Sequence, residues 1–401
     1  MKRRDFLKAS IAATAAVASH PLKADADTTT KKSDKAVVKK YTEIGKTGLK
    51  MSDISYGTGR LPSASMILRA VDRGINYFDT APDYGPSEKY MGEAMNKIQR
   101  DRIIITSKFC SPYAYPSHLP LGTKKGDYIA AVNGSLERLK TDYLDFCFVH
   151  AIGEQSDSRE KEENRLVNEE MLSAFETLKK SGKVRFLGVS SHGPNNMESL
   201  LMTAVTSGHF DLIMPSFNFM KFPDMMGLLK EAKQRNVGVV AMKTLAGAKD
   251  SGFDSKGAPF APAALKWVLN HPEVNGLVIT IKSVADMDLY LTASGEKLTA
   301  ADKKTLDLYA KQFNQEYCRT GCSDCEPSCP EGVSIATTLR YQMYFKDYGD
   351  EKTAMKYYTK LESNADPCLS CETEDCKGAC PHGLPVSSML REAHDNLTFM
   401  V

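Results

Sequence analysis

The sequence lacks several features that would assign it to particular protein classes. Its 52 basic and 50 acidic residues give a formal net charge of +2, so it has no excess of one sign to attract nucleic acid or an anionic membrane. No G-x-G-x-x-G follows the first expected strand and no G-x-x-x-x-G-K-[ST] occurs, which excludes the Rossmann and P-loop motifs. Beyond the N-terminus no apolar run is long enough for a membrane helix. We therefore expect no nucleic-acid partner and no stable membrane insertion.

The N-terminus resembles a bacterial twin-arginine export signal. Residues 2–8 read KRRDFLK and precede a weakly apolar stretch over residues 9–18 that is too short to span a bilayer. We expect a signal peptide over residues 1–26, a polar linker over 27–40 and a mature protein in the periplasm; a basic disordered tail is the alternative. Because this route carries folded, cofactor-loaded proteins, the signal is compatible with cofactors assembled in the cytoplasm.

Between residues 41 and 295, short β-branched runs alternate with amphipathic helical patterns. Eight such βα units in about 250 residues favour an α/β fold of the (β/α)8 TIM-barrel type over an open doubly wound sheet. A charged insertion over residues 153–165 is expected to be a lid or a solvated loop. The expected strands are 54–57, 75–78, 102–106, 144–149, 186–190, 212–215, 237–242 and 277–281, and the expected helices are about 64–73, 87–97, 127–140, 168–181, 196–207, 222–235, 261–269 and 284–293.

After residue 296 the βα alternation stops, and residues 296–401 are expected to form a small, mainly helical module. Thr299 and Asp302 predict a capped helix that continues to about Phe313. A tyrosine-rich helical stretch over about 334–361 then separates two runs of cysteines. The chain is therefore expected to hold a large barrel followed by a second domain.

Four polar residues fall at the carboxyl ends of three consecutive expected strands, where barrels of this type carry their chemistry. Asp79 ends the second strand, Tyr84 lies five residues further on, Lys108 follows the third strand and His150 follows the fourth. Each alone has a structural explanation, such as a helix cap or a packed aromatic ring. Together with the stretches EIGKTGLKMSDISYGTG, FDTAPDYG, ITSKF, GKVRFLGVSSH and FNFM, they resemble the Asp-Tyr-Lys-His tetrad of the aldo-keto reductase family.

The resemblance implies interconversion of a carbonyl and an alcohol on a small-molecule substrate. Hydride delivery to a carbonyl carbon builds negative charge on the oxygen, so an acid must protonate that oxygen. Tyrosine alone is a reluctant donor, and a neighbouring ammonium makes its phenolate more accessible. Tyr84 is accordingly expected as general acid, Lys108 as its modulator and Asp79 as the partner of that lysine, with His150 orienting the carbonyl.

The resemblance also implies NADP(H) or NAD(H), held at the ends of strands five to eight. Three departures from the family pattern stand out: Ser191 replaces a usual Asn, Met214 a usual Gln, and Asp288 an Arg of some members. They leave open a second hypothesis, a non-enzymatic electron-transfer or binding protein in which the barrel is a scaffold. The implied cofactor-binding residues are Ser190, Ser191, Phe217, Asn218, Lys243, Thr244, Leu245, Lys282 and Ser283.

Eight of the ten cysteines lie in two runs that both end in Cys-Pro. The spacings C-x3-C-x2-C-x3-C-P and C-x2-C-x4-C-x3-C-P share the last third of the bacterial ferredoxin pattern. They predict two 4Fe-4S clusters, with zinc and disulfides as alternatives, and resemble the ferredoxin-like extension of one aldo-keto reductase branch. Clusters imply a redox partner protein or a quinone-linked donor. The predicted ligands are Cys318, Cys322, Cys325, Cys329, Cys368, Cys371, Cys376 and Cys380.

The position of the fourth cysteine in each run leaves the ligand sets open. In two-cluster ferredoxins this cysteine ligates the other cluster, so Cys329 and Cys380 are candidates for exchange. The two remaining cysteines, Cys110 and Cys147, are expected to pack as small apolar residues, and Cys147 is expected to face the outer helices because Phe146 and Phe148 point inward.

Overall fold

The computed structural model describes residues 35–113, 116–154, 158–193, 196–220, 225–246, 253, 255, 257–319, 322–347, 349 and 351–398. The expected signal peptide and most of the expected linker lie outside these residues. The described chain begins with a short hairpin, β1 (Tyr41–Glu43) and β2 (Lys50–Ser52), which the sequence did not predict. Ile44 and Met51 of this hairpin join the hydrophobic cluster inside the barrel described next.

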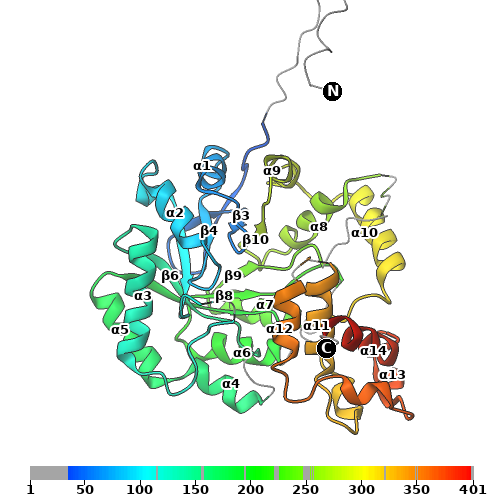
Figure 1. Ribbon diagram of the computed structural model, residues 1–401. Helices are drawn as coiled ribbons and strands as arrows, with labels where there is room; N and C mark the ends of the chain where they lie inside the picture. The colour runs from blue at the N-terminus through cyan, green and yellow to red at the C-terminus, as the bar shows by residue number, and fades with distance from the viewer. Residues whose placement is uncertain are drawn as a thin grey trace, which may run out of the picture. The chain divides into compact units, whose positions relative to one another are not determined.

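Eight parallel strands close into a barrel in chain order, with the last strand paired to the first (Figure 1). All eight lie within two residues of their expected positions, which confirms the predicted (β/α)8 barrel. Their bounds are β3 (Ile54–Gly57), β4 (Tyr77–Asp79), β5 (Ile104–Lys108), β6 (Leu144–Val149), β7 (Val184–Ser191), β8 (Leu212–Pro215), β9 (Gly238–Ala241) and β10 (Gly276–Thr280).

Helices surround the strands (Figure 1). Eight of them match the expected helices: α1 (Ala64–Asp72), α2 (Ser87–Met95), α3 (Lys125–Leu139), α5 (Glu169–Lys180), α6 (Met197–Ser207), α7 (Met225–Gln234), α8 (Phe260–Leu269) and α9 (Val284–Leu291). The expectation for the charged insertion was wrong in part, because Arg159–Leu166 forms an additional helix, α4, capped by the Ser158 side chain. Glu162 and Arg165 of α4 are buried and form an ion pair of 2.7 Å, so this part of the insertion is neither a lid nor a solvated loop.

The alternation of side chains along β6 divides the barrel core into two layers. Phe146 and Phe148 belong to the cluster inside the barrel, together with Met214. Cys147 belongs to the cluster between strands and helices, as the alternation predicted. The interior is therefore filled by side chains, and polar groups lie toward its carboxyl-terminal end.

The C-terminal part of the chain is helical, as expected. The predicted cap at Thr299 forms a complete capping box with Asp302 at the start of α10 (Ala300–Phe313). A separate hydrophobic cluster joins the later helices and includes Cys325, Cys368 and Cys376. These helices are α11 (Ile335–Lys346), α12 (Glu351–Tyr358), α13 (Asp375–Ala379) and α14 (Val386–Leu397).

Helix α11 contacts the carboxyl-terminal end of the barrel. The Arg340 guanidinium donates to the carbonyl oxygen of His192, the residue after β7, at 2.9 Å. The Lys243 ammonium, in the loop after β9, lies 5.2 Å from the centre of the Tyr344 ring. The C-terminal module therefore packs against the end of the barrel that carries the four predicted catalytic residues.

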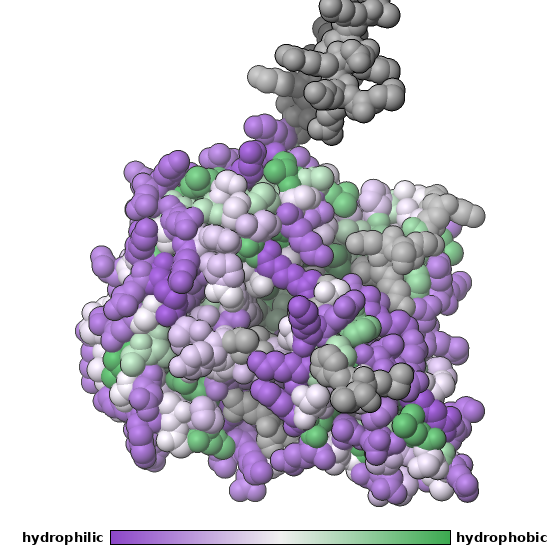
Figure 2. Space-filling view, viewed as in Figure 1, coloured by the Kyte–Doolittle hydropathy of each residue, from purple (hydrophilic) through white to green (hydrophobic). Residues whose placement is uncertain are grey.

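Polar side chains cover most of the face shown in Figure 2, where hydrophobic side chains are scattered. Among the residues the structure describes, no helix combines the length and the apolar character that a membrane span requires.

Candidate active site

The four predicted catalytic residues converge at the carboxyl ends of three neighbouring strands. Asp79 is the last residue of β4, Lys108 the last of β5, and His150 follows β6 directly. Tyr84 lies in the loop between β4 and α2, where its backbone takes part in two successive turns. Parallel pairing of β4, β5 and β6 brings these strand ends together.

Lys108 lies at the centre of the group. Its ammonium, on a residue only 1% exposed, donates to Asp79 Oδ1 at 2.6 Å and to the Thr80 carbonyl at 2.8 Å. The same ammonium lies 4.9 Å from the centre of the Tyr84 ring. The Tyr84 hydroxyl lies 3.4 Å from His150 Nε2. An anion, a cation, a phenol and an imidazole thus lie next to one another in this order.

Burial dominates the electrostatics of this group. It raises the pKa of Tyr84 well above the usual tyrosine value, and the carboxylates of Asp79 and Asp83 raise it further, so the phenol keeps its proton. Burial lowers the pKa of His150 well below its usual range, with the neighbouring His118 adding to the effect, so His150 is neutral. Burial also raises the pKa of Asp79, against the opposing charge of Lys108.

Asp83 and His118, which the sequence did not single out, join the site beside Cys110, which was expected to pack as a small apolar residue. The segment after β5 turns back on itself, so that Cys110 pairs with His118 in an isolated antiparallel bridge. Asp83 lies beside this segment and accepts a hydrogen bond from the Ser117 amide at 3.3 Å. The only sequence signals for these residues were their positions just after strands β4 and β5.

Glu154 and His192 complete the polar lining next to this group. The two side chains form a short ion pair, and His118 Nε2 lies 3.9 Å from Glu154 Oε2. The charge and the hydrogen bond of His192 lower the pKa of Glu154 against the opposing effect of burial. Glu154 therefore carries a negative charge at the barrel mouth.

The predicted cofactor-binding residues at the end of β7 and just after β8 make contacts with other residues of the barrel. Ser190 Oγ accepts a hydrogen bond from the Ala151 amide at 3.1 Å, and Ser191 Oγ donates to the Ile152 carbonyl at 2.7 Å. The Phe217 ring lies 5.1 Å from the ring of Trp267 on α8. The structure therefore places Phe217 between strands and helices, and does not bring it into the tetrad group.

The loop after β9 offers groups that a ligand could use. Asn218 donates to the Lys243 carbonyl at 3.2 Å. Thr244 is buried, and its hydroxyl has no hydrogen-bond partner among the described residues. Burial, together with the charge of Arg340, lowers the pKa of Lys243 to about 7. Leu245, which is half-buried, packs against the barrel core, and residues 247–252 lie outside the described residues.

The predicted residues near β10 are far less enclosed. Lys282 is exposed, and Ser283 caps α9 through a capping box with Asp286. Asp288, which stands where some aldo-keto reductases have an arginine, forms an ion pair with Arg73. The structure assigns Ser283 and Asp288 to contacts within the protein.

None of the ten cysteines forms a disulfide, and all ten lie among the described residues. Burial raises the pKa of Cys318 and the neighbouring Cys322 and Cys325 raise it further, with Cys380 also contributing. Burial likewise raises the pKa of Cys368 to about 11, with contributions from Cys329, Cys376 and Cys371. The cysteines thus form two electrostatic groups: Cys318, Cys322, Cys325 and Cys380 in the first, and Cys329, Cys368, Cys371 and Cys376 in the second.

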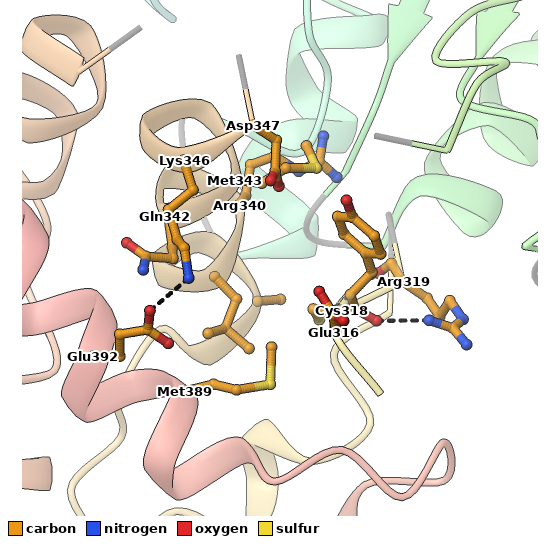
Figure 3. A pocket seen from close by; sticks show the side chains of 13 residues that line it. Glu316, Cys318, Arg319, Arg340, Gln342, Met343, Lys346, Asp347, Met389 and Glu392 are labelled. Carbon is orange, nitrogen blue, oxygen red and sulfur yellow. Dashed lines mark hydrogen bonds and ion pairs between the residues drawn. The ribbon is translucent and has the colours of Figure 1, made fainter. Parts of the chain in front are cut away.

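Two cavities accompany these groups. One, of about 20 Å³, is lined by all four cysteines of the second group. The other, of about 60 Å³, lies between α11 and α14 and is lined by Cys318 of the first group (Figure 3). Arg319 and Arg340 line the same cavity, so positive charge lies beside the first group.

Comparison with known proteins agrees with this geometry. Residues 54–262, just over half of the chain, match the aldo/keto reductase family, and residues 1–19 match the twin-arginine translocation signal sequence. The chain is 26% identical to L-galactose dehydrogenase of Arabidopsis thaliana over 308 residues, which cover 66% of this chain and 91% of that protein. It is 28% identical to L-glyceraldehyde 3-phosphate reductase of Escherichia coli K12 over 237 residues, 55% of this chain and 65% of that one.

A solved structure shows the same fold. The aldo-keto reductase AKR11C1 from Bacillus halodurans, in its holo form, superposes with a TM-score of 0.54 at 21% identity, covering 67% of this chain and 96% of that one. The family match and the two named relatives therefore favour the oxidoreductase hypothesis over the non-enzymatic alternative. The chain belongs to the aldo/keto reductase family and is an oxidoreductase with a twin-arginine export signal.

Proposed function

We propose that this protein is a periplasmic oxidoreductase that interconverts a carbonyl and an alcohol on a small molecule with NAD(P)(H), and exchanges electrons with a partner through two 4Fe-4S clusters. The observation that carries the proposal is the position of Lys108 between Asp79 and Tyr84, with His150 next to the phenol. The eight clustered cysteines on the same chain add the electron-transfer part.

The four residues divide the work of proton transfer. When bound, NAD(P)H supplies the hydride. Tyr84 donates the proton to the carbonyl oxygen, because its raised pKa keeps the phenol protonated until negative charge develops. Lys108 then stabilises the phenolate, and Asp79 keeps the ammonium charged and oriented. Neutral His150 donates a hydrogen bond from Nε2 to the same oxygen.

The residues after β9 fit the phosphates of such a cofactor better than those at the end of β7. The buried Thr244 hydroxyl is available to donate, and Lys243 gains charge as a phosphate approaches. Ser190 and Ser191 would have to exchange their present partners for the carboxamide. We therefore assign the phosphate contacts to Lys243 and Thr244. The other proposed cofactor-binding residues, which the present contacts support less, are Ser190, Ser191, Phe217, Asn218, Leu245, Lys282 and Ser283.

The spacing of the cysteines favours iron-sulfur clusters over zinc. Four thiolates around one zinc would lie about 3.8 Å apart, because the Zn–S bond is about 2.3 Å. Among the described residues, no three cysteines of the two runs have their sulfur atoms within 4.8 Å of one another. A four-iron cluster separates its thiolates more widely, and the two electrostatic groups suit the exchange of Cys329 and Cys380 seen in two-cluster ferredoxins.

Helix α11 suits a connection between the first cysteine group and the barrel. Arg340 donates to the His192 carbonyl at the barrel mouth, and its charge opposes the rise in the pKa of Cys318. A free nicotinamide pool is not expected outside the cytoplasm, so we propose that the cofactor is loaded before export and retained. A redox partner protein or a quinone-linked donor would then regenerate it through the clusters.

The test uses mature protein purified anaerobically. We expect about eight irons per chain and micromolar binding of NADPH or NADH in a fluorescence titration. Tyr84→Phe should bind the cofactor normally and lose about 10²- to 10⁴-fold in turnover. Tyr128→Phe, a buried tyrosine of α3, is the matched control and should keep its activity. Full activity in Tyr84→Phe would reject the assignment, and a colourless, iron-free protein would reject the clusters.

A further inference from the structure

A compact group of four potential metal ligands lies beside the tetrad. Asp83, Cys110, His118 and His150 each present one ligand atom, and the four atoms lie within 4.8 Å of one another. None of the four residues is more than 8% exposed. The group combines two imidazoles, a thiol and a carboxylate, which are the ligand types that zinc prefers.

The distances within the group suit ligand atoms around one ion, and those of Asp83 are too long for hydrogen bonds. Asp83 Oδ2 lies 3.8 Å from His118 Nδ1 and 3.9 Å from His150 Nδ1. Cys110 Sγ lies 3.7 Å from His118 Nδ1 and 3.2 Å from His150 Nδ1. An N–H···O hydrogen bond spans about 2.7–3.2 Å, so both contacts of Asp83 Oδ2 are too long. A tetrahedral zinc with bonds of about 2.0–2.3 Å separates its ligand atoms by about 3.3–3.6 Å.

We propose that Asp83, Cys110, His118 and His150 bind one zinc ion at the mouth of the barrel. Four protein ligands close the tetrahedron, so the ion has no open position for substrate and acts by fixing its ligands. The site is distinct from the two cysteine groups of the C-terminal module, because none of its ligands belongs to either run.

The surroundings supply what a zinc site needs beyond its ligands. A zinc-bound imidazole normally turns its second nitrogen toward a carboxylate or another acceptor. The nearest carboxylate oxygen to His118 Nε2 is Glu154 Oε2, at 3.9 Å, which is longer than a hydrogen bond but places an acceptor on that side of the ring. Asp83 Oδ1 is buried and has no hydrogen-bond partner among the described residues, so the charge of this carboxylate is incompletely compensated by the protein.

The zinc ion would set the role of His150 in the proposed reaction. Coordination through Nδ1 leaves the proton on Nε2, and Nε2 is the nitrogen that lies 3.4 Å from the Tyr84 hydroxyl. His150 would then always present a donor to the substrate oxygen. The zinc site itself does not depend on that function, so its test measures metal content and not turnover.

The test compares the full-length mature chain with variants that each lose one buried side chain, either a proposed ligand or the thiol of Cys147. Protein purified anaerobically, with its iron retained, should contain one zinc per chain by elemental analysis. Cys110→Ala and His118→Ala should lose at least nine-tenths of this zinc, while Cys147→Ala, whose sulfur lies one strand away and is equally buried, should keep it. Equal zinc in Cys110→Ala and Cys147→Ala, or no zinc in the wild type, would overturn the proposal.

X-ray absorption at the zinc edge of the wild-type protein gives an answer even if a variant fails to fold. The proposal requires one sulfur and three nitrogen or oxygen neighbours around zinc. Four sulfur neighbours would place the metal in the cysteine runs and would refute the site.

Discussion

Replacing Asp79 by asparagine removes the anion that Lys108 contacts at 2.6 Å. Lys108 is 1% exposed and its ammonium also donates to the Thr80 carbonyl, so water cannot take the place of the carboxylate. Removing one partner of a buried ion pair costs about 3–5 kcal/mol, because the other charge stays buried without compensation. Asparagine keeps the shape of the aspartate side chain and one of its acceptor oxygens, so we expect a loss of stability at the lower end of this range, about 3 kcal/mol.

A scanning calorimeter measures this effect as a shift in the unfolding temperature. At about 2–4 °C per kcal/mol for a domain of this size, Asp79→Asn should lower the midpoint of the barrel transition by at least about 6 °C. Glu231→Gln is the control, since it breaks an exposed pair with Arg235 within one helix turn, worth about 0.3–0.5 kcal/mol. Equal midpoints in the two variants would show that the buried ion pair does not stabilise the barrel.

Three further predictions concern the cofactor, the clusters and the packing. Affinity for NADH should rise as the pH falls from about 9 to 6, because Lys243, with its pKa lowered to about 7, becomes protonated and then binds the pyrophosphate. The affinity of Lys243→Gln should not change over this range. A wild-type affinity that is independent of pH would contradict the phosphate contact. The double variant Cys325→Ala/Cys329→Ala removes one ligand from each cysteine group and should lose about eight irons. The double variant Cys329→Ala/Cys376→Ala removes two ligands from the second group and should lose about four. The reverse result would mean that each run holds its own cluster. Gly188→Ala should destabilise the protein by about 1–3 kcal/mol, since a Cβ there would lie 2.2 Å from the Phe148 ring. In Gly227→Ala of α7 the added Cβ has no atom within 4 Å, and the variant should stabilise the protein by about 0.5–1 kcal/mol. Similar unfolding midpoints for the two glycine variants would refute the close packing of Gly188 against Phe148.

Much of the barrel could be predicted because its signals are local. Each strand is a short apolar run bounded by turn residues, and the cap at Thr299 needs only Asp302 three residues later. The positions of the four candidate residues were predictable for a related reason, since a residue that ends a parallel strand must lie at the carboxyl-terminal face of the barrel. Asp79 and Lys108 needed no knowledge of the rest of the fold.

The charged insertion shows where local signals failed. Its composition is that of a solvated loop, yet Glu162 and Arg165 are buried as an ion pair in α4. Arg165 also donates to the His150 carbonyl at 2.6 Å, a contact between residues 15 apart. Burial of charge in such a helix depends on the partners that the fold supplies, and composition does not contain that information.

The sequence by itself determined the barrel, the strand-end positions of the four candidate residues and the existence of two cysteine runs, because each depends on the order and spacing of neighbouring residues. The tertiary structure alone decided which side chains meet across loops. It brought Asp83, Cys110 and His118 to His150, placed Phe217 against α8, and set Arg340 of α11 on the His192 carbonyl. These contacts join segments from different strands and modules, and only the closure of the barrel and the packing of α11 bring those segments within reach of one another.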